Sequence, residues 1–335
     1  MQPRHHDRTE RDGVVWAMFV GLTLAWGASF LFIKIGLNEG LEPFTLVAWR
    51  MTLATLFLGA VLLVSRGRIP RAPGALPRIA LLGLLNVAVP ALLLTWGSQW
   101  IPSALASILN GLQPLFAIVL AGLVLHDEPI TVDRLLGLLL GFGGAVLLVS
   151  PNLGDPGPDV SASEALLGEL AVILAALSYA VAAVYARRFV TGARLVLDPV
   201  AGPRRATSAE IALTQVAAAA CVTVTLAMVA ERPDGGLPLL APPPTPSAWF
   251  AVLWVGVLGS GVAYLLFFGI MRAWGATRTT LVTYALPVIG IALGVVVLGE
   301  RLHVEEAAGT ALVLAGLVVA SRRRGRVVFG RQPPV

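Results

Sequence analysis

The chain is a series of long apolar runs separated by short polar connections. Each run holds about 20 residues, which as a helix crosses a bilayer core of about 30 Å. This pattern predicts an all-α integral membrane protein with ten transmembrane helices. The expected helices occupy about residues 14–37, 43–65, 76–97, 102–126, 133–150, 164–186, 208–230, 247–271, 274–299 and 304–321.

One part of the pattern occurs twice, because residues 103–150 resemble residues 276–321. The matched positions are Pro114 and Pro287, Glu128 and Glu300, Gly137 and Gly309, and Gly144 and Gly316. The spacing from the glutamate to both glycines is the same in the two copies, whereas the first copy has one extra residue between proline and glutamate. Such self-similarity indicates a tandem duplication.

The duplication divides the chain into two five-helix repeats. We expect the first at residues 14–150 and the second at residues 164–321, separated by a Pro- and Gly-rich loop, with cytoplasmic tails at 1–13 and 322–335. A repeat with an odd number of spans places its second copy upside down in the membrane. The sequence therefore predicts inverted repeats, an architecture that recurs among transporters.

Composition and charge agree with a membrane location. The chain is 57% hydrophobic and 13% charged, with a mean hydropathy of +0.82, whereas soluble domains carry about 25% charged residues. The net charge of +5 does not indicate nucleic-acid binding, because twenty arginines fall in segments predicted inside and only Arg232 and Arg301 fall outside. This bias predicts a multi-pass protein of the cytoplasmic membrane with both termini in the cytoplasm.

Four stretches carry a resemblance to a known family. They are AWGASFLFIKIGL at residues 25–37, PFTLVAWR at 43–50, PLFAIVLAGLVLHDEPITVDRLLGLLLGFGGAVLL at 114–148 and PVIGIALGVVVLGERLHVEEAAGTALVLAGLVV at 287–319. In their order and spacing they resemble the EamA-type members of the drug/metabolite transporter superfamily. The resemblance covers nearly the whole chain and implies a secondary transporter of small organic solutes, often an exporter of amino acids or related metabolites.

Two polar helix faces are candidates for the substrate site. Residues three and four apart lie on one face of a helix, and both Pro114 and Pro287 follow such a face. A proline frees a backbone carbonyl about one turn earlier, so the polar side chains either satisfy that carbonyl or face a hydrated cavity. The predicted cavity residues are Ser107, Asn110, Gln113, Thr280, Thr283 and Tyr284. Asn86, Tyr264, Trp26 and Tyr179 are weaker candidates for the same cavity.

Two cations lie inside predicted spans. Lys34 is about one turn from the outer end of the first helix, so it either snorkels to the interface or joins the cavity. Arg50 is about two turns deep, which predicts an interior position paired with carbonyls or a carboxylate. Since both belong to the outer half of one repeat, they are also candidates for a joint site that binds a substrate carboxylate.

The remaining candidates are structural or mechanical. Pro114, Pro287, Glu128 and Glu300 are predicted hinge or gate residues, with a purely structural role for the glutamates as the alternative. Glycines of the fifth and tenth predicted helices suit close helix packing, either within the bundle or in a homodimer.

Several function classes lack their motifs. The sequence has no Walker phosphate loop, no HExxH and no nucleophile elbow, and it leads us to expect no cofactor and no metal. We predict a transporter that exports small organic metabolites such as amino acids or amines by alternating access, contacting substrate and membrane lipid as a monomer or homodimer. A polytopic membrane enzyme and a non-transporting membrane scaffold are the alternatives. No carboxylate lies at the centre of a predicted span, and Glu164 and Glu169 come nearest. Obligate proton coupling therefore lacks an obvious carrier residue.

Overall fold

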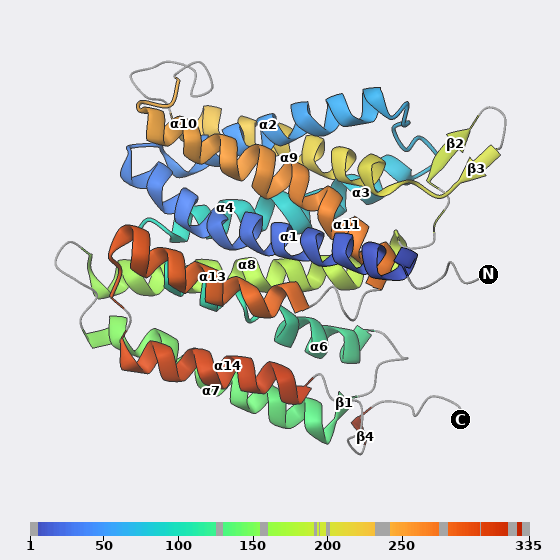
Figure 1. Cartoon of the computed structure of the whole chain (residues 1–335). Helices are drawn as coiled ribbons and strands as arrows, with labels where there is room; N and C mark the ends of the chain where they lie inside the picture. The colour runs from blue at the N-terminus through green and yellow to red at the C-terminus, as the bar shows by residue number, and fades with distance from the viewer. Residues whose placement is uncertain are drawn as a thin grey trace.

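The computed structural model describes residues 6–124, 130–154, 160–190, 193, 195–198, 202–231, 242–274, 281–301, 303–320 and 327–329. Within these residues the chain is a bundle of helices that run back and forth along one direction (Figure 1). The first half contains α1 (His6–Asn38), α2 (Pro43–Val64), α3 (Ala75–Gly83), π-helix η1 (Leu84–Ala88), α4 (Val89–Gly97), α5 (Ser103–Asn110), α6 (Gln113–Val124) and α7 (Val132–Gly154). The second half contains α8 (Ala162–Phe189), α9 (Ser208–Ala230), α10 (Pro246–Leu253), π-helix η3 (Trp254–Val262), α11 (Ala263–Trp274), α13 (Leu281–Leu298) and α14 (Val304–Ala320).

In the described part of the chain, four very short strands lie outside the bundle. β1 (Ile130–Thr131) pairs antiparallel with β4 (Val327–Phe329), and β2 (Val196–Asp198) pairs antiparallel with β3 (Gly202–Arg204). The chain is otherwise built from helices, as the sequence predicts.

Seven helical segments in the described part of the chain are long and apolar enough to cross a membrane. They are Gly13–Asn38, Pro43–Val64, Ala75–Gly97, Ser103–Val124, Ala162–Phe189, Ser208–Ala230 and Pro246–Met271. This finding confirms a multi-pass helical membrane protein. The other three predicted spans fall on α7, α13 and α14.

Several predicted boundaries are wrong. α1 begins at His6, inside the predicted N-terminal tail, and α7 continues to Gly154 instead of ending at residue 150. Trp274, expected to begin the ninth helix, instead ends α11. Its ring lies 4.7 Å from that of Trp16 and 5.8 Å from that of Phe19, both on α1. This aromatic contact explains why α11 continues one turn beyond its expected end at Met271.

Two helices begin with capping boxes, in which a Ser or Thr is followed three residues later by Glu. Ser161 accepts a hydrogen bond from the backbone N–H of Glu164 at the start of α8, and Thr207 accepts one from Glu210 at the start of α9. In both, the glutamate accepts a hydrogen bond from the backbone N–H of the capping residue. These caps satisfy N–H groups that a helix leaves unpaired, and α9 accordingly has the predicted bounds.

Three apolar spans are irregular near their middle. The third predicted helix contains η1 and the eighth contains η3. The span with Pro114 is divided into α5 and α6 at Gly111, whereas α13 continues through Pro287. Irregular backbone of this kind occurs within membranes where it lines a cavity or is buried in protein, and π-bulges are frequent at functional sites.

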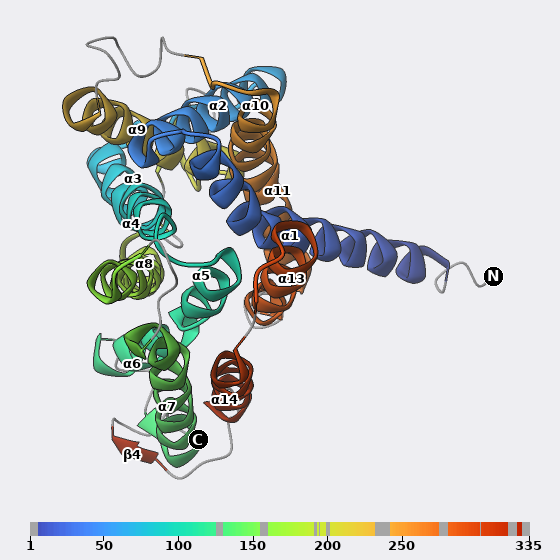
Figure 2. The ribbon, with the colours of Figure 1, turned by 90° about the vertical axis from the view of Figure 1, so that its left-hand side faces the viewer.

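Helices from the two halves are interleaved. α2 packs against α9 and η3, α1 against α11 and α13, and α8 against α4 and α6. α7 and α14 pair with each other at the end of the bundle far from α2 and α10 (Figure 2).

Glycines allow the α7–α14 contact. A Cβ added to Gly144 would lie 2.6 Å from the backbone oxygen of Gly309, and one added to Gly309 would lie 2.7 Å from that of Gly144. A Cβ on Gly316 would lie 2.5 Å from the oxygen of Gly137. The glycine face thus packs within the bundle, the first of the two predicted alternatives.

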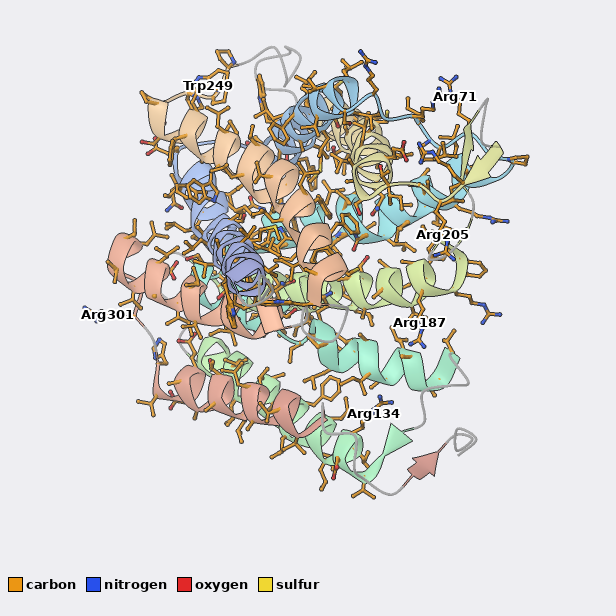
Figure 3. The ribbon with its side chains drawn as sticks, turned by 45° about the vertical axis from the view of Figure 1, so that its right-hand side comes forward. Arg71, Arg134, Arg187, Arg205, Trp249 and Arg301 are labelled. Carbon is orange, nitrogen blue, oxygen red and sulfur yellow. The ribbon has the colours of Figure 1, made fainter. Side chains whose placement is uncertain are left out.

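Arginines mark the two ends of the bundle. Arg71, Arg134, Arg187 and Arg205 lie at one end and Arg301 at the other (Figure 3). α1 begins and α14 ends at the arginine-rich end (Figure 1). This distribution agrees with the sides to which the sequence assigned these residues.

Candidate functional site

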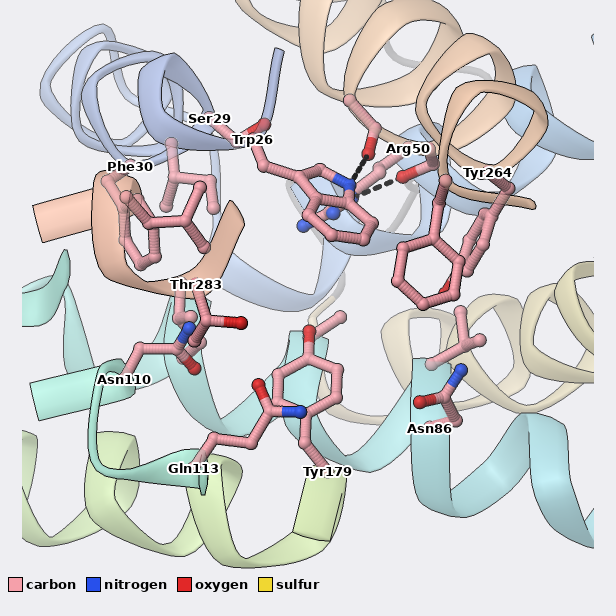
Figure 4. A pocket seen from close by; sticks show the side chains of 18 of the residues that line it. Trp26, Ser29, Phe30, Arg50, Asn86, Asn110, Gln113, Tyr179, Tyr264 and Thr283 are labelled. Atoms are coloured by element: carbon pink, nitrogen blue, oxygen red, sulfur yellow. Dashed lines mark hydrogen bonds between the residues drawn. The ribbon is translucent and has the colours of Figure 1, made fainter. Parts of the chain in front are cut away.

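A cavity of about 170 Å³, partly open to solvent, lies between the two halves. Helices from both halves line it, with the side chains of Trp26, Arg50 and Tyr264 on one wall and those of Gln113 and Tyr179 facing them (Figure 4). Among the described residues that line it there is one charged side chain, that of Arg50, and no Asp, Glu, His or Lys. Its wall combines amides, hydroxyls and aromatic rings, a composition suited to a small organic molecule.

Arg50 is held by η3. Its Nε donates to Ser260 Oγ at 2.9 Å, and Ser260 Oγ donates to the carbonyl of Val255, five residues earlier, at 2.9 Å. Arg50 faces the interior as predicted, but the expected pairing with carbonyls or a carboxylate is wrong among the described residues, because a hydroxyl is its partner. The π-helix supplies that hydroxyl by placing the small residues Gly259 and Ser260 against α1 and α2.

A second polar pair, of two amides, joins the two halves in the reciprocal way. Asn86 of η1 donates from Nδ2 to Gln215 Oε1 of α9 at 3.2 Å. Gln215 is the eighth residue of α9, as Arg50 is the eighth of α2. Each pair therefore joins the second helix of one half to the π-helix of the other.

The break between α5 and α6 brings Asn110 and Gln113 to the cavity. Asn110 is 6% exposed, and its Oδ1 has no hydrogen-bond partner within the described part of the chain. Thr283 of α13 lines the same cavity close to Asn110 (Figure 4). Three of the six predicted cavity residues on these helices thus come together.

The other three predicted residues are not among the described residues that line the cavity. Ser107 is fully buried, donates to the carbonyl of Ala104 at 2.7 Å and packs against Gly290 of α13, so it lies in a helix interface instead of the cavity. Thr280 lies outside the described residues, and Tyr284 belongs to α13 without a described side chain. Asn86, Tyr264, Trp26 and Tyr179, the weaker candidates, all line the cavity.

Lys34 does not line the cavity. Its Nζ donates to the carbonyls of Ser98, Gln99 and Ile101 at 2.8, 3.2 and 3.0 Å. These carbonyls follow the C-terminal end of α4, where a cation is favourable because the helix dipole is negative. The predicted joint site with Arg50 is therefore wrong, since Lys34 binds backbone instead.

Glu300 caps the N-terminal end of a helix, whereas Lys34 binds carbonyls at a C-terminal end. Its Oε1 accepts from the N–H of Ser103 at 2.7 Å, and its Oε2 accepts from the N–H of Ala104 at 2.9 Å. A carboxylate from the end of α13 thus caps the N-terminus of α5, where the dipole is positive. Pro287 of α13 lies beside Gly111, where α5 and α6 are divided: a Cβ added to Gly111 would lie 3.4 Å from its Cγ. Glu128, its counterpart in the first repeat, lies outside the described residues.

Sequence inspection missed Ser260, the partner of Arg50. The only signal was a small-residue triplet, Gly259–Ser260–Gly261, inside an apolar run. Gln215 was missed as well, although it is a polar residue in the middle of a predicted span.

Comparisons with known proteins show which fold and which proteins this chain resembles. A solved crystal structure superposes with a TM-score of 0.60 at 21% identity, covering 92% of this chain and 96% of the other, which shows a shared fold. The chain is 24% identical to an uncharacterized transporter of Archaeoglobus fulgidus, over 92% of this chain and 99% of that protein. It is 26% identical to the uncharacterized inner membrane transporter YedA of Escherichia coli strain K12, over 96% of this chain and 94% of that protein.

A third relative carries a more specific name. It is a probable terminal-alkyne amino-acid exporter of Streptantibioticus cattleyicolor, 31% identical over 40% of this chain and 44% of that protein. The model of the EamA-like transporter family matches residues 13–150 and again residues 166–322. The chain therefore belongs to the EamA-like transporter family.

Proposed function

We propose that this protein is a secondary transporter that exports small organic metabolites, such as amino acids or amines, across the cytoplasmic membrane by alternating access. In this proposal ten helices cross the membrane as two inverted five-helix repeats, both termini are cytoplasmic, and the cavity around Arg50 is the substrate site. Membership of a transporter family supports the activity, and the relative named an amino-acid exporter supports the direction and substrate class.

The observation that carries the proposal is the reciprocity of the cavity wall. Arg50 bonds to Ser260 and Gln215 bonds to Asn86, so each half sends its second helix to the irregular third helix of the other half. The larger contacts follow the same rule: α1 packs on α11 and α13, and α8 packs on α4 and α6. A twofold relation of this kind, with a polar site at the repeat interface, is the arrangement that lets a carrier open to either side.

The lining also bears on energy coupling. Proton-coupled carriers commonly use intramembrane carboxylates or histidines, and the described cavity residues include neither. Glu169 is fully buried on α8 but does not line the cavity. The proposal is therefore facilitated exchange, with Glu169 as the first residue to test if a proton gradient accelerates it.

The test is counterflow in proteoliposomes. Vesicles loaded with a pool of amino acids and amines are diluted into labelled members of that pool, with and without a pH gradient. Selective, saturable exchange that empty liposomes lack is the expected result. If no member of the pool exchanges while the purified protein remains monodisperse, the proposed function is wrong.

A further inference from the structure

We propose that the cavity recognises its substrate by a carboxylate, which the Arg50 guanidinium binds, and that it discriminates against amines without a carboxylate. The inference rests on the transport function proposed above and narrows its substrate class. It follows from the charge of the lining, from the way Arg50 is held and from the neutral groups opposite it.

The charge of the cavity favours a single negative group. Arg50 supplies one positive charge, and no other charged side chain is present among the described lining residues. A charge inside a membrane protein is costly unless it is paired, and a carboxylate neutralises Arg50 with one unit. An amine would instead add a second positive charge to the same low-dielectric space, which disfavours its charged form. A phosphate dianion would exceed what one arginine neutralises.

The geometry leaves the binding end of Arg50 available. Ser260 accepts from Nε, and this is the hydrogen bond that the guanidinium makes within the described part of the chain. Both terminal Nη groups remain, and this planar fork matches the two oxygens of a carboxylate. Ser260 in turn is fixed by the carbonyl of Val255. The bond to η3 therefore orients the fork, so Ser260 is a positioning residue for the site.

The other side of the cavity fits the remainder of an α-amino acid. Asn110 Oδ1 is a buried acceptor without a partner among the residues that the structure describes, and Gln113 and Thr283 lie nearby (Figure 4). Such neutral oxygens accept hydrogen bonds from an ammonium group but do not balance its charge. Phe30 and Leu94 supply apolar wall for a side chain. An ammonium is thus accommodated, and the carboxylate provides the charge complement.

The first experiment uses the wild-type protein and three matched pools. They are the standard amino acids, the amines formed by their decarboxylation, and the carboxylates formed by their deamination. Counterflow is measured at zero membrane potential, because the pools differ in net charge. We expect both carboxylated pools to compete with amino-acid exchange and the amines to do so at least about 10-fold more weakly, the effect of one charge-assisted hydrogen-bond pair.

The second experiment assigns the preference to Arg50. R50Q should lower carboxylate-dependent exchange about 10- to 100-fold, whereas R50K, which keeps the charge without the fork, should retain the preference with weaker apparent affinity. R301Q removes an exposed arginine by the same chemical change and should leave exchange unaltered. S260A should raise the apparent KM for carboxylates while the preference over amines remains.

The outcomes separate the two proposals. Amines that compete as well as carboxylates in the wild type overturn the inference, even if R50Q fails to fold. A folded R50Q protein that still prefers carboxylates overturns it as well. Exchange of none of the three pools refutes the proposed function and with it the inference.

Discussion

The contact between α7 and α14 gives a prediction in which one glycine is essential and its neighbour is not. A Cβ at Gly144 would lie 2.6 Å from the backbone oxygen of Gly309 and 2.9 Å from both the backbone nitrogen and Cγ2 of Val313. A Cβ at Gly143 would meet no atom within 4 Å. G144A should therefore destabilise the protein, and G143A should not.

The size of the difference follows from the same distances. Ordinary van der Waals contact begins near 3.4 Å, so G144A forces the two backbones apart by several tenths of an ångström, and overpacking of this order costs about 1–3 kcal/mol. Exchange of glycine for alanine in a helix also brings a gain of up to about 1 kcal/mol. Both variants lie in the interior of α7, so this gain cancels between them. The difference in unfolding free energy between G143A and G144A should be about 1–3 kcal/mol.

The assay is thermal unfolding of the purified protein in one detergent, followed by tryptophan fluorescence. G144A should unfold at a lower temperature than the wild type, and G143A at an equal or higher one. G309A meets the same contact from the other helix, so the G144A/G309A double variant should lose less than the sum of its parts. Equal shifts in melting temperature for G143A and G144A would refute the intramolecular glycine contact. A G144A protein that changes its oligomeric state but keeps its melting temperature would refute it as well.

The remaining predictions concern helix ends. K34M leaves three carbonyls without their donor, so the melting temperature should fall by the equivalent of about 1–3 kcal/mol while the substrate preference of the folded protein stays unchanged; a selective loss of carboxylate transport would return Lys34 to the binding site. E300Q keeps one acceptor for the two N–H groups at the start of α5, so hydrogen exchange at Ser103 and Ala104 should accelerate, and unchanged protection would argue against the cap. Glu231 accepts from the first N–H groups of α2, yet burial raises the pKa of its carboxyl. Because the pKa is raised in the folded state, stability is greatest below the ordinary value of about 4.3 and falls as pH rises through the folded pKa. The melting temperature of the wild type should therefore fall as pH rises from below about 4.3 through the folded pKa. The melting temperature of E231Q should not show this fall.

The sequence predicts the membrane spans well because the bilayer imposes them. A run of about 20 apolar residues is long enough to cross the hydrocarbon core, whichever helices it packs against. Local caps such as Thr207 with Glu210 then fix where α9 begins. Arginine placement predicts which connections share a side, since that bias depends on position in the chain and not on packing. These are local properties, and one sequence contains them.

The parts that could not be predicted depend on distant residues. Apolar residues surround most of each span, so the 3.6-residue period does not tell a lipid-facing side from a buried one. Ser260 lies 210 positions from Arg50, and neither residue indicates the other. Lys34 and Arg50 have the same charge in the same repeat, but only the fold reveals that one caps α4 while the other lines the cavity. The π-helices also escape prediction, because they depend on a shift in backbone hydrogen bonding and not on residue type.

The cross-half bonds limit how a carrier of this architecture can change access. If one sequence half rocked as a block against the other, the Arg50–Ser260 and Gln215–Asn86 bonds would break together, and the tight contact of η3 with α2 would separate. Gly256 of η3 leaves so little space that an added Cβ would lie 2.9 Å from Leu53 of α2, so this contact is not easily lost. The irregular points outside these pairs are the break between α5 and α6 and the proline within α13, and both lie beside the cavity. If Arg50 binds the substrate as proposed, a change of access that keeps Arg50 bound to Ser260 requires bending at the α5–α6 break and within α13. In that motion α2 stays paired with η3, and α9 stays paired with η1.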